Sequence, residues 1–185
     1  MISDIKRAKF GQYFEVTDMD DDGKITKKDF LSSADKVIEV LKLDPASMPA
    51  QMLNASYLQT WDTLVGDSDD KDAVTVDWWI EHFYQIGLDK KNLDAYVTGR
   101  AYAILQLFDA DHDQHISKDE WTLFFRTIGH PERHYEMGFQ KLDRNGDGLL
   151  TKDEIKTAAR EFFASDDPEA SGNWLFGDYT AHLRA

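Results

Sequence analysis

Apolar residues recur three or four positions apart in several long segments of the 185-residue chain. These segments flank four short acidic stretches, and they run from Phe10 to Phe14, Phe30 to Leu41, Tyr57 to Val65, Tyr96 to Phe108, Leu123 to Ile128 and Ile155 to Phe163. The period is that of an amphipathic α-helix with one buried face. One more short helix is expected from Pro131, in the first helical position, to Leu142. The pattern predicts a helix–loop–helix unit repeated four times, without a long strand.

The four acidic stretches share one spacing of oxygen-bearing residues, and they cover residues 18–29, 67–78, 109–120 and 143–154. A twelve-residue calcium loop takes side-chain oxygens at positions 1, 3, 5 and 12 and a backbone carbonyl at position 7, and it turns sharply at a glycine in position 6. The first stretch offers Asp18, Asp20, Asp22, the carbonyl of Lys24 and Asp29, and the fourth offers Asp143, Asn145, Asp147, the carbonyl of Leu149 and Glu154. With Gly23 and Gly148 at position 6, both are predicted to be calcium-binding loops of the EF-hand type. We number the stretches loops one to four.

Position 8 is apolar in every loop, where the chain carries Ile25, Val74, Ile116 and Leu150. In paired EF-hand loops this residue lies in a short antiparallel ladder. We therefore expect Ile25 to pair with Val74, and Ile116 with Leu150.

Loop one departs from the usual pattern at position 12, where Asp29 replaces glutamate. Aspartate is one methylene shorter, so it either draws the following helix inward or binds through one oxygen. Fewer oxygens and a tighter cage favour magnesium over calcium. Loop one is therefore predicted to be a mixed calcium and magnesium site.

Loop three keeps its oxygens but lacks the glycine, because Gln114 occupies position 6. Its predicted ligands are Asp109, Asp111, Asp113, the carbonyl of His115 and Glu120. A positive φ costs a residue other than glycine about 1–2 kcal/mol, which is little beside the attraction of four carboxylates for a divalent ion. We expect Gln114 to adopt left-handed backbone angles when metal is bound and to weaken the site without abolishing it. His112 is expected to point outward, and the oxygen-rich ligand set disfavours zinc.

Loop two is predicted to be silent. Asp67 and Asp69 hold positions 1 and 3, but Lys71 places a cation at position 5 and Trp78 stands at position 12. Its expected role is that of a scaffold for loop one, with Trp78 and Trp79 filling the core.

The composition limits the possible partners. The net charge of −14 makes cations the natural ligands and argues against nucleic acid or stable membrane association, which need basic surfaces. Without cysteine, disulfides, thiolate nucleophiles and zinc–thiolate sites are excluded. No apolar run approaches a membrane span and the first residues lack a signal-peptide core, so a cytoplasmic location is expected. No spacing of residues indicates catalysis, so an enzyme is not expected.

The chain resembles the sarcoplasmic calcium-binding proteins of invertebrates and the related calexcitins. The resemblance rests on active loops one, three and four beside a silent second loop, and on the segment EFFASDDPEASGNWLFG at residues 161–177. It implies a compact, all-α globule that acts as a monomeric cytosolic buffer of calcium and magnesium through three sites, without an obligatory protein target. It also implies that Trp174, Leu175 and Phe176 pack into apolar surface. The expected parts are an N-terminal pair at 1–89, a C-terminal pair at 90–164 and a tail at 165–185.

Two other functions stay open at this point. Coelenterate photoproteins and luciferin-binding proteins also use loops one, three and four and enclose a luciferin among aromatic residues. Candidates for such a cavity are Trp78, Trp79, His82, Trp121, Trp174, Tyr179 and His182. The other function is a calcium sensor of the calexcitin kind.

Overall fold

The computed structural model describes residues 1–128 and 133–183. Its elements, in chain order, are α1 (Asp4–Glu15), β1 (Lys24–Thr26), α2 (Lys27–Val40), α3 (Met48–Gly66), β2 (Ala73–Thr75), α4 (Val76–Leu88), α5 (Lys90–Phe108), β3 (His115–Ser117), α6 (Lys118–Thr127), α7 (Arg133–Leu142), β4 (Leu149–Thr151), α8 (Lys152–Ala164) and the 3-10 helices η1 (Ser171–Trp174) and η2 (Thr180–Leu183). Each acidic loop thus lies between two helices, as the periodicity predicts. The prediction that Pro131 opens a helix falls outside the described residues.

The helices that leave the four loops are α2, α4, α6 and α8, and each begins directly after loop position 9. The residue at position 9, which is Thr26, Thr75, Ser117 or Thr151, caps the helix that leaves the loop. In loops one, three and four the residue at position 12 completes a capping box, because its carboxylate accepts the backbone N–H of the capping residue. The carboxylate expected to ligate metal therefore also fixes where the helix begins.

Two short ladders join the loops in pairs. Strands β1 and β2 are antiparallel with Ile25 opposite Val74, and β3 and β4 are antiparallel with Ile116 opposite Leu150. All four side chains are buried. Both predicted pairings are confirmed.

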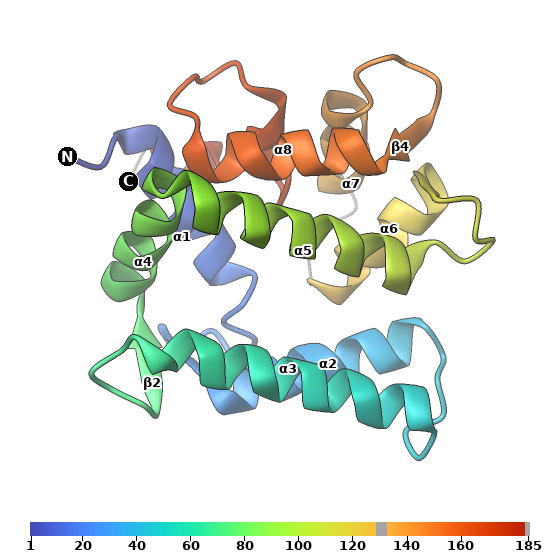
Figure 1. The fold of residues 1–185 in the computed structure, drawn as a ribbon, viewed down its shortest axis with the longest axis horizontal. Helices are drawn as coiled ribbons and strands as arrows, with labels where there is room; N and C mark the ends of the chain where they lie inside the picture. The colour runs from blue at the N-terminus through green and yellow to red at the C-terminus, as the bar shows by residue number, and fades with distance from the viewer. Residues whose placement is uncertain (129–132, 184–185) are drawn as a thin grey trace.

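The helices pack around one large core, and the α2–α3 pair has a smaller apolar cluster of its own. Figure 1 shows α2 and α3 side by side along the lower edge, α5 and α8 side by side above them, and α1 and α4 on the left between these layers. The largest cluster of buried apolar residues runs from Phe10 on α1 through Trp79 on α4 and Trp121 on α6 to Phe162 on α8. The core crosses the expected boundary at residues 89 and 90, and the three-part division remains a prediction. The compact all-α fold is confirmed.

The prediction that Trp78 and Trp79 both fill the core is half right. Trp79 is 1% exposed. Trp78 is only half-buried, and its ring stacks on His82 with ring centres 4.7 Å apart. It lies at the border of the core, among the partly buried residues that pack against it.

The segment after α8 folds back over the helices. Leu175 and Phe176 are buried, and the ring of Phe176 stacks on Tyr13 of α1 at 4.3 Å and 14°. Trp174 is half-buried. Gly172 lies so close to α8 that a Cβ atom there would stand 2.2 Å from the carbonyl oxygen of Ala158. Among the described residues, no helix has the length and apolar character needed to cross a bilayer.

Candidate metal-binding loops

Loop one brings three acidic side chains together. Carboxylate oxygens of Asp18, Asp20 and Asp22 lie within 4.8 Å of one another. The backbone turns at Gly23 with φ of 82°, and this turn lets the Gly23 N–H donate to Oδ2 of Asp18 at 2.8 Å. Lys24, whose carbonyl is the predicted backbone ligand, opens β1. Negative oxygens this close repel one another, so the arrangement fits a divalent cation of the calcium or magnesium type.

Asp29 closes loop one from end to end. Its Oδ1 accepts the N–H of Met19 at 3.0 Å, and its Oδ2 accepts the N–H of Thr26 at 2.8 Å. The longer Glu120 makes the same two bonds in loop three, to Ala110 and Ser117. Because Asp29 reaches both partners with one methylene fewer, the start of α2 must lie closer to loop one. This favours the first of the two expectations for Asp29.

Loop three also gathers acidic oxygens. Those of Asp109, Asp111 and Glu120 lie within 4.8 Å of one another. Asp113 lies outside this group, and its Oδ1 accepts the N–H of His115 at 2.7 Å. The position 5 residue makes the same turn in loops one and four, since Asp22 accepts from Lys24 and Asp147 from Leu149. His115, whose carbonyl is the predicted backbone ligand, opens β3.

Gln114 has a φ of 69°, so the predicted left-handed conformation is confirmed. Its N–H donates to Oδ2 of Asp109 at 3.0 Å, which is the bond that Gly23 makes in loop one. The glutamine therefore preserves the turn and its hydrogen bond. His112 is exposed, as expected.

Loops one, three and four each contain a second left-handed residue, which was not predicted from the sequence. Position 4 has φ of 56° at Asp21, 62° at His112 and 72° at Gly146. In loop two, by contrast, neither Asp70 at position 4 nor Asp72 at position 6 is among the positive-φ residues of the described chain. The backbone itself thus separates loops one, three and four from loop two. The residue types at position 4 are a partial signal of this conformation, because aspartate, histidine and glycine tolerate it better than most residues.

Loop four has the most regular geometry. Asp143 accepts the N–H of Gly146 at 2.8 Å and of Gly148 at 2.9 Å. Leu149 opens β4, and Asn145 donates its side-chain amide to Asp147 at 2.9 Å.

Glu154 completes this loop by accepting the N–H groups of Arg144 at 3.0 Å and Thr151 at 2.9 Å. Burial acts to raise the pKa of Glu154, but hydrogen bonds from Thr151 and from the backbone of Arg144 and Asn145 outweigh it and hold the pKa below its usual value. The free carboxyl group is therefore kept in its anionic form, which is the form that binds a cation.

Loop two contains a cation of its own. The Nζ of Lys71 donates to the carbonyl oxygens of Val65 at 2.7 Å, Gly66 at 3.1 Å and Ser68. The carbonyls of Val65 and Gly66 belong to the last turn of α3, where the helix dipole favours positive charge. With no oxygen at position 5, Asp70 accepts the N–H of Asp72 at 2.8 Å instead. The loop is therefore held by a side-chain ammonium in place of ligands.

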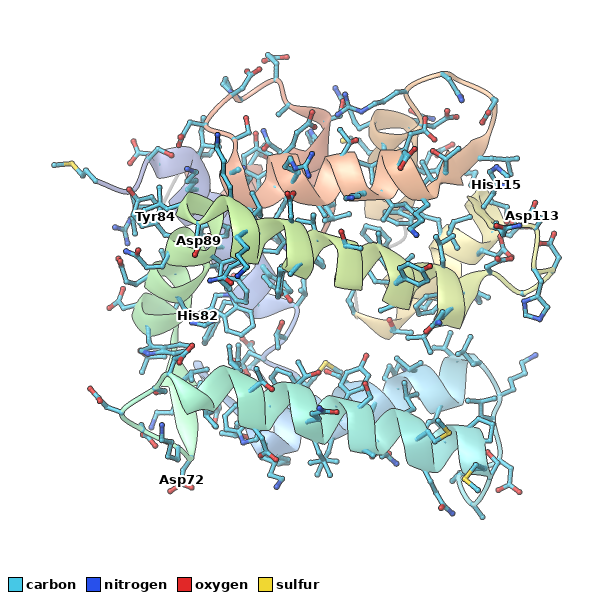
Figure 2. The ribbon with its side chains drawn as sticks, viewed as in Figure 1. Asp72, His82, Tyr84, Asp89, Asp113 and His115 are labelled. Atoms are coloured by element: carbon cyan, nitrogen blue, oxygen red, sulfur yellow. The ribbon has the colours of Figure 1, made fainter. Side chains whose placement is uncertain are left out.

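The two pairs of loops lie at opposite ends of the molecule. Figure 2 places Asp72 of loop two at the lower left, and Asp113 and His115 of loop three at the opposite end. Loops one and two share one end through the β1–β2 ladder, and loops three and four share another through β3–β4.

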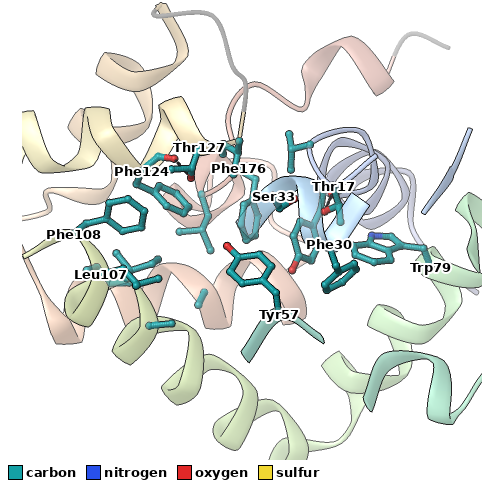
Figure 3. A pocket seen from close by; sticks show the side chains of 18 residues that line it. Thr17, Phe30, Ser33, Tyr57, Trp79, Leu107, Phe108, Phe124, Thr127 and Phe176 are labelled. Atoms are coloured by element: carbon teal, nitrogen blue, oxygen red, sulfur yellow. Dashed lines mark hydrogen bonds between the residues drawn. The ribbon is translucent and has the colours of Figure 1, made fainter. Parts of the chain in front are cut away.

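Between the α2–α3 pair and the C-terminal helices lies an internal cavity of about 140 Å³. Figure 3 shows its lining, which includes Phe30, Tyr57, Phe124 and Phe176. Of the seven aromatic residues considered for a luciferin cavity, only Trp79 lines it. The others are engaged elsewhere, for example Trp121 against Phe124 and Phe125, and Trp174 against Tyr179.

The comparisons with known proteins agree with this geometry. The EF hand family model matches residues 10–32 and 138–158, which contain loops one and four. A sarcoplasmic calcium-binding protein of Perinereis vancaurica tetradentata is 30% identical over 127 residues, which cover 69% of this chain and 71% of that protein. The chain belongs to the sarcoplasmic calcium-binding protein family. It is accordingly a calcium-binding EF-hand protein.

Further proteins are similar to this chain in structure or in sequence. The structure of a sarcoplasmic calcium-binding protein from amphioxus aligns with a TM-score of 0.76 at 18% identity and covers 96% of this chain and 99% of that one. Clytin of Clytia gregaria, a photoprotein, is 27% identical over 182 residues, covering 95% of this chain and 88% of clytin. A calcium-binding mitochondrial carrier of Dictyostelium discoideum is 26% identical, but this chain spans only 20% of its length. These relatives are calcium-binding proteins and photoproteins rather than enzymes, in agreement with the prediction that the chain is not an enzyme.

Proposed function

We propose that the protein is a cytoplasmic, monomeric calcium buffer that binds ions in loops one, three and four, with magnesium competing in loop one. The observation that carries the proposal is the shared backbone of these loops. In each of them positions 4 and 6 are left-handed, and the residue at position 12 bonds to the N–H groups of positions 2 and 9. Loop two lacks the two left-handed turns.

The ligands in the proposal are those expected from the sequence. Side chains at positions 1, 3, 5 and 12 and the carbonyl at position 7 supply oxygens, which calcium accepts in sets of six to eight. In loop one Asp29 draws the cage together, which favours the smaller magnesium ion with its shorter metal–oxygen distances.

A buffer role, as opposed to a sensor role, is supported by the segment after α8. Sensors open an apolar groove when calcium binds. Here Leu175 and Phe176 are buried, and Phe176 packs against both Tyr13 and Phe162. The surface that a target helix would need is thus covered by the chain itself, and no obligatory protein target is proposed.

Calorimetric titration with calcium, with and without millimolar magnesium, tests the proposal. Three sites are expected, one of them weakened strongly by magnesium. Asp18→Ala, Asp109→Ala and Asp143→Ala should each remove one site, while the matched change Asp67→Ala in loop two should leave three. A fourth site, or a loss of one in Asp67→Ala, would refute the assignment. Retention on phenyl resin only with calcium would favour a sensor.

A luciferin-binding function is the second candidate, favoured by the similarity to clytin and by the aromatic lining of the internal cavity. The size of that cavity speaks against it, because 140 Å³ is well below the roughly 300–1,000 Å³ typical of sites that enclose organic ligands. Light emission on calcium addition after incubation with coelenterazine would establish this function in place of the buffer alone.

A further inference from the structure

Loop four contains an asparagine that is followed directly by glycine. The chain has asparagine at positions 54, 92, 145 and 173, and these are followed by alanine, leucine, glycine and tryptophan. Asn145 and Gly146 are both exposed, as are Asp147 and Gly148 after them. Because glycine has no Cβ atom, its backbone nitrogen can approach the side chain of the preceding residue without steric hindrance. Water and base reach the bond between Asn145 and Gly146 from solvent.

An asparagine in this setting is open to loss of its amide group. The backbone nitrogen of Gly146 gives its proton to solvent base and attacks the Cγ atom of Asn145, and the Cγ–Nδ2 bond breaks as ammonia leaves with one proton from solvent. The product is a five-membered cyclic imide. Water then opens the imide at either of its two carbonyl groups, which gives aspartate or isoaspartate at position 145. The net reaction consumes one water and releases one ammonia.

The folded loop keeps both reacting groups in hydrogen bonds. The N–H of Gly146 donates to Oδ1 of Asp143 at 2.8 Å. The side chain of Asn145 accepts the N–H of Asp147 at 2.9 Å and donates from Nδ2 to Oδ2 of Asp147 at 2.9 Å. The attacking nitrogen is thus tied to Asp143, and the amide that it attacks is tied to Asp147. Cyclisation requires these hydrogen bonds to break.

The residues that restrain the reaction are also the ligands proposed for calcium. An ion bound by Asp143, Asn145 and Asp147 fixes all three side chains at once. Without the ion, the negative charges of Asp143, Asp147 and Glu154 repel one another, and an exposed loop with few packed contacts opens at little cost. The reaction is therefore expected in the ion-free loop. This step rests on the proposed assignment of loop four as an ion site.

We propose that Asn145 is a deamidation site and that the ion in loop four protects it. Isoaspartate adds one methylene to the main chain between positions 3 and 4 of the loop. The turn at Gly146, which has a φ of 72°, and the ligands that follow it are then displaced. Loop four loses its ion, while loops one and three keep theirs. A chain that spends long periods without calcium is converted in this way from three sites to two.

The test ages the full chain at mildly alkaline pH, either in calcium or in EDTA, and measures the acid form of residue 145 by peptide mass spectrometry. Free calcium at about 100 times the dissociation constant of loop four should slow deamidation roughly 100-fold, because only the ion-free loop reacts. Asn92 is exposed but followed by leucine, so it should stay intact and is the internal control. A calcium effect below twofold, or an unmodified Asn145 in EDTA, would overturn the proposal.

Two variants locate the protection in loop four. Glu154→Gln removes a ligand but leaves Asn145 and Gly146 in place, so in calcium the variant should deamidate at least tenfold faster than the wild type. Asp153→Asn removes the neighbouring exposed carboxylate, which is not a ligand position, and should change the rate less than twofold. Equal rates in the two variants would show that the ion in loop four does not protect Asn145.

Calorimetric titration separates this proposal from the assignment of the ion sites. Protein aged in EDTA should lose calcium binding in loop four in proportion to its isoaspartate content, whereas protein aged in calcium should keep three sites. Fresh protein without a site in loop four would contradict the proposed function and the protection together. A filled loop four with calcium-independent deamidation, or an isoaspartate form that still binds calcium there, would contradict the present proposal alone.

Discussion

The Oε2 atom of Glu161 accepts the backbone N–H of Gly172 at 2.9 Å, which ties the last turns of α8 to η1. The other carboxylate oxygen accepts a hydrogen bond from the guanidinium of Arg144, the second residue of loop four. A single carboxylate therefore holds both a metal loop and the segment that covers the apolar surface of the helices.

Glu161→Ala should loosen the segment after α8. The loss in unfolding free energy is expected to be about 1–2 kcal/mol, mostly from the bond to Gly172, because the Arg144 pair is exposed to water. Hydrogen exchange should accelerate at residues 171–176 with calcium present. Glu169→Ala removes an exposed carboxylate of the same segment and serves as the control. Unchanged exchange in Glu161→Ala would show that Glu161 does not hold this segment.

Gln114→Gly should tighten calcium binding by loop three. The glutamine holds a φ of 69°, and removing this strain is worth roughly 1 kcal/mol, or about fivefold in affinity. His112→Gly at position 4 should act in the same direction. Site-resolved titration measures both effects. If affinity stays the same in Gln114→Gly, the turn carries no cost and our account of loop three fails.

Asp29→Glu should shift loop one toward calcium. The longer side chain no longer needs the start of α2 drawn inward, so the cage widens and suits the larger ion. The ratio of calcium to magnesium affinity should rise, as measured by competition titration. Glu154→Asp in loop four is the matched reverse change and should lower the ratio there. An unaltered preference in Asp29→Glu would contradict a role of Asp29 in ion selection.

Lys9 should make stability depend on pH. It is fully buried and donates to the carbonyls of Glu161 and Ser165 and to Oδ1 of Asn173 at 3.0 Å. Burial, and then the charge of Lys6, lower its pKa from 10.5 to about 7. Between these two values the unfolded chain binds more protons than the folded one, so folding stability rises with pH across that window and levels off below about pH 7.

The test compares the wild type with Lys9→Met by denaturant unfolding from pH 6 to pH 10. Their difference in unfolding free energy should change in favour of the wild type by at most about 1.4 kcal/mol per pH unit. Lys91→Met removes an exposed lysine and should run parallel to the wild type. Parallel curves for Lys9→Met as well would mean that Lys9 keeps an ordinary pKa when folded.

Several features were predictable because they depend on local spacing. Helix periodicity gave the four units, and the apolar residue at position 8 gave the register of both ladders. The conformation of Gln114 followed from its place in the loop. In these cases one short stretch of sequence contains all the groups that determine the structure.

The backbone conformation at loop position 4 could not be predicted from the residue type at that position. Asp21 and Asp70 are the same residue type at the same loop position, yet only Asp21 has a positive φ. What differs is position 5, where Asp22 accepts a backbone N–H while Lys71 turns to the end of α3. The backbone thus depends on a neighbour's hydrogen bond and not on the residue's own preference.

Contacts between segments that are distant in the sequence could not be predicted either. The burial of Lys9 depends on partners that follow it by more than 150 residues. These contacts have no sequence signature.

Because the ammonium of Lys71 holds loop two, the two pairs of loops are expected to differ in how they take up calcium. Ladder-coupled loops influence each other's occupancy only when both accept an ion. The N-terminal pair has one competent loop under our assignment, so it titrates as an independent site with a Hill coefficient of one. Under the same assignment the C-terminal pair has two competent loops joined through Ile116 and Leu150, so cooperative uptake is expected in that half.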